Sequence, residues 1–329
     1  MHVRSRLWLL MLVGVSLSGC LDSNRSPTLK ESMNPAPVDR TKLDAAEAQL
    51  SSIESDLQRA GGMPPVERHA YESAMGPRLE QAVVAAAETR LENKALYYLA
   101  NWRFTYQEAA GVDQLLNQLA GLSSPALKSA GDRLRVMVRL RQGRVNEARA
   151  MAVQLVERIP EFSPVLDLVI FHETVGSAAP KVVSNNLTGG PDEPVSKRSE
   201  PWLFYLFIDA LDDQALFLIQ RYLDAMAILP VGERRIVCVT YDANLLSATT
   251  RVRSLPRASE IDLLWANPNN GGNAGEWSKA WKLPAKNPHI ALLGPGPNRT
   301  IMAVEMTPES LRALLTVGVP KATESKEAK

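Results

Sequence analysis

The chain has 329 residues, which is long enough for two hydrophobic cores. Its 37 basic and 36 acidic side chains give a formal net charge of +1, so the composition favours no nucleic-acid partner. Only two cysteines occur, Cys20 and Cys238, and the position of the first indicates where the protein is located.

The N-terminus has the outline of a signal peptide. Arg4 and Arg6 precede an apolar stretch over residues 7–15, which is too short to span a bilayer as a stable helix, and small residues follow. The motif Leu17-Ser18-Gly19-Cys20 resembles the bacterial lipobox, which implies cleavage before Cys20 and diacylation of its sulfur. The alternative is a plain signal peptide or an N-terminal anchor helix with an incidental cysteine.

Lipidation of Cys20 predicts attachment to a membrane, because each buried CH₂ group of an acyl chain contributes about 0.8 kcal/mol. We expect a location at the cell membrane or the outer membrane, with an extracytoplasmic globular part that is periplasmic in a Gram-negative cell. Leu21, by resemblance to enterobacterial sorting signals, permits outer-membrane transfer. Residues 20–40 are rich in Ser, Pro and Asn and predict a flexible tether.

Residues 41–176 are predicted to form an all-helical domain. In the first helix, apolar residues recur every three or four positions and form one stripe: Leu43, Ala46, Leu50, Ile53 and Leu57. Further helical runs are expected at about 66–91 (interrupted at Gly76-Pro77), 93–109, 112–120, 125–141 and 146–158. The short breaks between them predict antiparallel neighbours.

Residues 143–160 resemble the second half of a tetratricopeptide (TPR) repeat. A glycine turn opens the segment and Pro160 closes it. The helix between them is small or apolar at its packing positions, Ala148, Ala152 and Leu155. The preceding helix departs from the family pattern because it carries charges at such positions: Asp132, Arg135 and Arg139. The region is therefore interpreted as TPR-like, with an ordinary helical hairpin as the alternative.

A basic cluster lies in the same region and contains Arg133, Arg135, Arg139, Arg141, Arg144 and Arg149. We interpret it as a solvated face of the helices. A contact with lipid head groups or with an acidic partner is the alternative.

After Pro180 the pattern changes to short apolar runs. They occupy residues 202–209, 234–241, 261–266, 289–294 and 299–305. Helical segments lie between the first three runs, which predicts strands buried on both faces and parallel to one another. The last two runs are joined by a short Pro- and Gly-rich turn and predict an antiparallel hairpin.

The order of these elements resembles the thioredoxin-like fold, specifically its membrane-tethered redoxin branch, from about 180 to 317. Residues 182–196 are similar to the opening hairpin of that family, and residues 203–215 to its central strand and the start of its active-site helix. Residues 283–301 are similar to its segment with a cis-proline, a strand, a turn and a final strand, and Pro288 takes the place of that proline. A different small α/β sandwich is the alternative.

The resemblance implies a Cys-x-x-Cys motif at the helix start, but this chain has Asp212-Asp213-Gln214-Ala215 there. Thiol-disulfide exchange needs an attacking thiolate and a second sulfur, and a carboxylate can replace neither. Cys238 lies in the middle of an apolar strand and is interpreted as a core residue, with a redox centre as the alternative.

Asp212 and Asp213 are interpreted as residues that cap the helix. The alternative is a small polar site that they form with Asn287, beside Pro288, and with His289, where two carboxylates and an imidazole would bind a cation or perform acid-base chemistry. We expect no metal and no cofactor.

Residues 267–277 are interpreted as a flexible connection, because they have neither the lysine nor the glycine spacing of a phosphate-binding loop. The tryptophans around this segment are Trp265, Trp277 and Trp281. We interpret them as packing the loop down, with a binding lip as the alternative.

The predicted fold class is α plus α/β, with a helical TPR-like region followed by a thioredoxin-like domain with a mixed sheet. The expected parts are a signal (1–19), a lipidated tether (20–40), a helical domain (41–176), a thioredoxin-like domain (180–318) and a charged tail (319–329). The predicted function is binding or assembly near a membrane with a protein partner. The alternative is an enzyme that uses Cys238 or an Asp212, Asp213 and His289 site.

Overall fold

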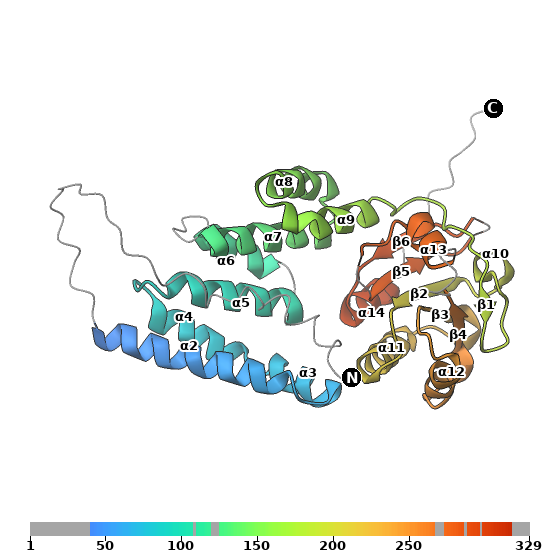
Figure 1. Cartoon of the computed structure of the whole chain (residues 1–329), viewed down its shortest axis with the longest axis horizontal. Coiled ribbons are helices and arrows are strands. Elements are labelled where there is room, and N and C mark those ends of the chain that lie inside the picture. Colours follow the sequence, from blue (N-terminus) through green and yellow to red (C-terminus); the bar gives the residue numbers. More distant parts are fainter. Residues whose placement is uncertain are drawn as a thin grey trace. The chain divides into compact units, whose positions relative to one another are not determined.

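The structure is a computed structural model, and it describes residues 40–107, 110–119, 125–266, 273–285, 288–296 and 298–317. Cys20, the tether up to residue 39, Asn287 and the charged tail lie outside these ranges. The chain divides after Met151 into two compact units (Figure 1). Within the described ranges, no helix combines the length and the apolar character needed to cross a membrane.

The first unit is helical, as predicted. Its elements are α2 (Arg40–Ala60), α3 (Pro65–Ser73), α4 (Gly76–Ala86), α5 (Glu92–Tyr106), α6 (Ala110–Gln118), α7 (Pro125–Arg141) and the start of α8 (Val145–Arg158). The predicted apolar stripe of α2 is confirmed, since Ala46, Leu50 and Ile53 are buried. Consecutive helices pack on one another, with α4 on α5 and α5 on α6.

A glycine turn joins α7 to α8, as the sequence predicted. Gly143 has a φ of 71°, and the amide of Arg144 donates to the carbonyl of Arg139 at 2.9 Å, which is the bonding pattern of a helix that ends at a left-handed glycine. The three predicted packing positions, Ala148, Ala152 and Leu155, are fully buried. One hairpin does not define a repeat, so the TPR-like interpretation stays a prediction.

The arginine cluster is not a simple solvated face, and that interpretation was wrong for much of it. Nη1 of Arg139 lies 2.8 Å from both carboxylate oxygens of Asp113, which α6 supplies. The guanidinium of Arg141 lies 3.6 Å from the ring centroid of Phe104. Arg135 bonds Asp132 at 2.8 Å and also donates to the carbonyl of Leu116. These arginines hold helices together because partners distant in the sequence fold beside them.

The second unit contains a six-stranded mixed sheet with the order β1-β4-β3-β2-β5-β6. The elements are α9 (Ser163–His172), β1 (Asn185–Asn186), α10 (Pro194–Lys197), β2 (Trp202–Ile208), α11 (Asp213–Met226), β3 (Arg234–Thr240), α12 (Leu245–Arg253), β4 (Ile261–Trp265), α13 (Asn273–Trp281), β5 (His289–Leu293), β6 (Ile301–Val304) and α14 (Pro308–Val317), with short 3-10 turns at Pro160–Phe162, Val231–Glu233 and Ala258–Glu260. Strands β2, β3 and β4 are parallel, and β5 and β6 form the antiparallel hairpin. Both expectations are confirmed.

The strand arrangement is that of a thioredoxin-like fold. Strands β2 and β3 are joined by the crossover helix α11, β5 pairs antiparallel with the other side of β2, and β6 and α14 follow. Because helices cover both faces of the sheet, Leu203 to Ile208 are buried without alternation. Alternate side chains such as Leu206 and Cys238 pack on the α11 and α14 side, whereas Tyr205 and Phe207 pack on the α13 side.

Three sequence predictions need correction. Residues 194–197 form the short helix α10 and not a strand, because Pro194 begins it and the Glu193 carboxylate accepts from the amide of Ser196 at 3.2 Å. The preceding strand of that hairpin shrinks to the two residues of β1. The segment interpreted as a flexible connection contains α13 from Asn273 onward, and α9 was not predicted.

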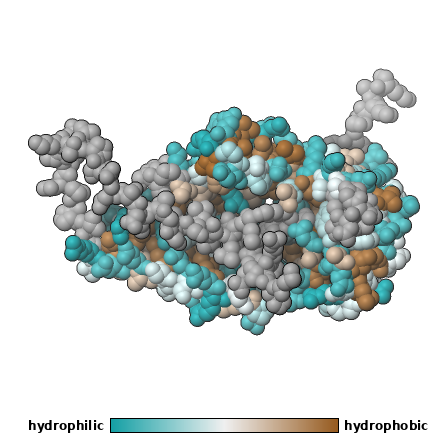
Figure 2. Space-filling view, in the orientation of Figure 1, coloured by the Kyte–Doolittle hydropathy of each residue, from teal (hydrophilic) through white to brown (hydrophobic). Residues whose placement is uncertain are grey.

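The outer edge of β6 is covered by the chain that follows α9. The amide of Gly176 donates to the carbonyl of Ile301 at 2.8 Å, and the amide of Ile301 donates to the carbonyl of Ser177 at 2.9 Å. This pairing blunts an edge that would otherwise offer free backbone groups to another chain. On the visible surface, hydrophilic and hydrophobic residues are intermixed (Figure 2).

Candidate functional site

The start of α11 is the place where the resembling family carries its redox motif, and here it is built from carboxylates. Oδ1 of Asp212 accepts from the amide of Ala215 at 2.9 Å and so caps the helix. Asp213 has an 80% exposed side chain and lies 2.9 Å from Nη1 of Arg251, which is 42% exposed. The capping interpretation is confirmed for Asp212, and an ion pair as exposed as that of Asp213 contributes little to stability.

Asp242, which the sequence analysis did not single out, fixes the neighbouring turn after β3. Its Oδ2 accepts from the amide of Leu211 at 3.1 Å, and its Oδ1 accepts from the amide of Asn244 at 2.9 Å. The carboxylate therefore ties the end of β2 to the end of β3. The sequence did contain a signal for this role, because an acid and then a helix-capping Asn come directly after an apolar strand.

His289 begins β5 and is buried, with Nδ1 2.9 Å from Oε1 of Glu305. Its ring packs on Phe171 of α9, with the two centroids 5.7 Å apart. Strand alternation puts His289 on the α9 and α13 side of the sheet, whereas α11 packs on the opposite side. The two aspartates and His289 therefore come from elements on different sides.

Asn287 lies outside the described residues, and Pro288 is half-buried directly before β5. The polar site of Asp212, Asp213 and Asn287 thus stays a prediction. Over the ranges that the structure describes, no three His, Cys, Asp or Glu side chains gather as metal ligands would.

Cys238 is fully buried in the apolar core on the α11 side of β3, so the core interpretation is confirmed. Burial raises the pKa of its thiol far above the usual value, and the negative charge of Asp262 adds to the effect. Both causes disfavour the thiolate, which is the nucleophile in disulfide exchange.

Two of the three tryptophans, Trp277 and Trp281, are buried against the sheet and form no exposed lip, whereas most of the loop that they were expected to pack down lies outside the described residues. Trp277 and Trp281 of α13 are 1% and 0% exposed. The ring of Tyr205 lies 4.8 Å from that of Trp281, and the ring of Phe207 lies 5.2 Å from it. Trp265 donates from Nε1 to the carbonyl of Asp242 at 3.1 Å.

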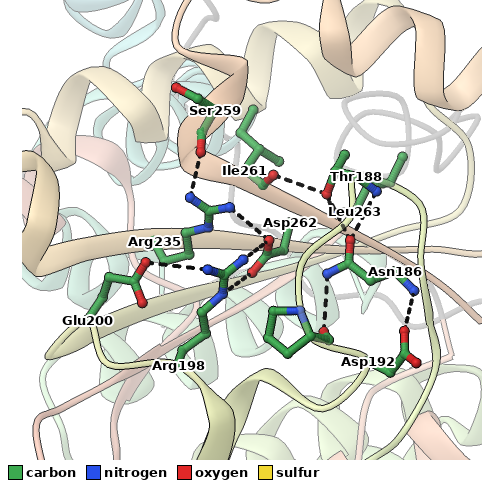
Figure 3. Close-up of polar contacts among 11 residues, drawn as sticks. Asn186, Thr188, Asp192, Arg198, Glu200, Arg235, Ser259, Ile261, Asp262 and Leu263 are labelled. Carbon is green, nitrogen blue, oxygen red and sulfur yellow. Dashed lines mark hydrogen bonds and ion pairs between the residues drawn. The ribbon is translucent and has the colours of Figure 1, made fainter.

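A second polar cluster was missed by the sequence analysis (Figure 3). The fully buried carboxylate of Asp262 in β4 lies between the guanidinium groups of Arg198 and Arg235. Its signal was a single acid within the apolar run of residues 261–266, because a charge in a buried strand requires partners. The partners themselves were not predictable, since Arg198 is 64 residues away in the sequence.

No family model and no curated protein matches the chain. Several solved structures resemble it. The thioredoxin domain of a thiol-disulfide oxidoreductase from Bacteroides vulgatus is 14% identical, with a match that covers 44% of this chain and 96% of that chain and a TM-score of 0.36. A thiol:disulfide interchange protein from Bacteroides sp. is 17% identical, with 46% and 95% covered and a TM-score of 0.36.

A thioredoxin-like protein from Bacteroides caccae is 10% identical, with 74% of this chain and 83% of that chain covered and a TM-score of 0.37. Resemblances at this level assign no role to any residue. The second unit is therefore described as thioredoxin-like by its own strand order and strand directions.

Proposed function

We propose that the chain is a lipid-anchored extracytoplasmic protein whose thioredoxin-like unit has no redox activity and serves binding or assembly near a membrane. The observation that carries the proposal is the start of α11. It presents the cap Asp212 and the exposed carboxylate of Asp213, where the resembling family needs two sulfurs. A carboxylate forms no mixed disulfide.

The location of the remaining thiol supports the same proposal. Cys238 is buried on β3, and its raised pKa leaves the thiol protonated near neutral pH. Under the lipobox interpretation, the sulfur of Cys20 carries an acyl chain and is not free. Neither cysteine then supplies an attacking thiolate.

A redox assay tests the proposal directly. Purified protein should reduce insulin disulfides with dithiothreitol no faster than the blank and should not consume peroxide, and Cys238→Ser should change neither rate. A dithiol thioredoxin serves as the positive control. Turnover that disappears in a folded Cys238→Ser variant would favour the redox enzyme instead.

The binding role needs a separate measurement. Crosslinking in intact cells, followed by capture of the chain from detergent-solubilised membranes, should recover the same protein partner in repeated experiments. Quantitative comparison with a capture of an unrelated lipoprotein is the control. A chain that repeatedly crosslinks to nothing above that control would contradict the binding role.

A further inference from the structure

Residues 184–200, which we call the strap, first run along β4 and then reach the N-terminal ends of β3 and β4 at Arg198 (Figure 3). The strap includes the two residues of β1, which pair with β4, and the amide of Leu187 donates to the carbonyl of Leu263 at 2.7 Å. Its apolar contacts come from the buried Pro194 and Val195 and from the partly buried Leu187, which packs on the core beside α11. Its other attachments are polar.

One carboxylate joins the strap to the sheet. Oδ2 of Asp262 lies 2.7 Å from Nε of Arg198 in the strap, and Oδ1 lies 2.9 Å from Nη2 of Arg235 in β3. Oδ1 also accepts from Nη2 of Arg198. Asp262 is 0% exposed, so water does not screen these bonds.

The strap closes directly on this carboxylate at Gly190. A Cβ atom there would lie under 3.0 Å from side-chain atoms of Asp262, Arg198 and Asn186. Any larger residue at position 190 therefore requires these side chains, including the bonded pair of Asp262 and Arg198, to shift.

Another arginine, Arg299, holds only the C-terminal end of the strap. Arg299 is buried and donates to the carbonyls of Val195 at 3.2 Å, Arg198 at 2.6 Å and Glu200 at 2.6 Å. These bonds fix the chain where it leads into β2. The part from 184 to 192 is attached to β4 by the short β1 pairing, by two side-chain hydroxyls that bond the β4 backbone, and by its close approach to Asp262.

The closed arrangement leaves three buried polar atoms without a hydrogen-bond partner: the hydroxyl oxygen of Tyr205, Oε2 of Glu200 and Nε of Arg235. Nε of Arg235, whose guanidinium bonds Asp262, would gain water as a partner if the strap lifted. Unpaired buried groups destabilise the closed state relative to an open one. The sheet beneath keeps its own parallel ladders between β2, β3 and β4.

We propose that residues 184–192 of the strap open while its C-terminal end stays on Arg299 and β2 to β6 stay paired, and that Asp262, through Arg198 and the contact at Gly190, is the latch that keeps this part closed. The latch is one carboxylate that pairs with two guanidinium groups. Removing its negative charge leaves the positive charges of Arg198 and Arg235 close together without an anion between them. Local opening of this kind is seen as faster amide exchange in one segment alone.

Hydrogen-deuterium exchange of the full-length chain, read by mass spectrometry, tests the proposal. Asp262→Asn should speed exchange in peptides from residues 184–192 by about tenfold or more, with peptides from β2 and β3 unchanged. The matched control is Glu260→Gln. Glu260 is also a buried carboxylate, paired with Arg234 at 2.8 Å, and its ion pair does not involve the strap.

Gly190→Ala provides a second test from the strap side, because it removes no charge. It should give the same segment-specific increase in exchange as Asp262→Asn. The proposal is overturned if both variants speed exchange in the strap and in the sheet by the same factor. It is also overturned if neither variant folds. In either case the strap does not open separately from the sheet. The proposal is also overturned if the strap exchanges as fast in Glu260→Gln as it does in Asp262→Asn.

Discussion

Cys238 is the residue on which any redox interpretation depends. Because it is 0% exposed and burial raises its pKa, we expect it to react with a thiol reagent such as DTNB only after denaturation. The measurement compares absorbance in native buffer with absorbance in guanidinium chloride. Cys238→Ser is the control, since any signal that remains in it comes from Cys20. Rapid reaction of native Cys238 would contradict the core assignment.

Gly76 is required by a close approach within the first unit. A Cβ at this position would lie under 3.0 Å from three ring atoms of Trp102. The indole cannot move freely, since its Nε1 donates to the carbonyl of Glu72 at 2.7 Å. Gly76→Ala should therefore lower the free energy of unfolding by about 1–3 kcal/mol, measured by urea titration.

Gly131 is the matched control for this substitution. It lies within α7, and an added Cβ would meet no atom within 4 Å. Gly131→Ala should raise the free energy of unfolding by about 0.5–1 kcal/mol, because alanine loses less backbone entropy on folding. Equal destabilisation by both substitutions would mean that the Trp102 contact is not the cause.

At the scale of the element, α11 depends on its cap. Asp212→Ala removes the side-chain acceptor of the Ala215 amide and should destabilise the protein by about 1 kcal/mol. Asp213→Ala, one residue further on, removes only an exposed ion pair with Arg251 and should cost less than about 0.5 kcal/mol. The midpoints of chemical unfolding distinguish the two. A greater loss of stability in Asp213→Ala than in Asp212→Ala would mean that Asp213 does more than form an exposed ion pair.

At the scale of the whole molecule, the expected anchor decides where both units are located. Cys20→Ala should release the protein into the soluble extracytoplasmic fraction or leave it as an uncleaved precursor, because no acyl chain is then attached. Membrane fractionation and labelling with a palmitate analogue measure this. Cys238→Ser is the control and should stay at the membrane. Normal cleavage with unchanged acylation in Cys20→Ala would refute the lipoprotein prediction.

The amino-acid sequence by itself determined the elements whose stability is local or whose burial is complete. The five strands and most helices were predictable, because an apolar run or stripe needs only a hydrophobic partner of any identity. The role of Asp212 was predictable for the same reason, since a cap bonds an amide three residues away. The core position of Cys238 followed from its apolar neighbours.

The tertiary structure alone decided which charged groups meet. Arg198 finds Asp262 from 64 residues away, and Arg139 finds Asp113 from 26 residues away. The strand expected at the end of the 182–196 hairpin became the helix α10, because Glu193 and Pro194 favour a helical turn locally. Polar partners are specific and directional, so their pairing depends on the final position of the backbone, whereas apolar burial does not.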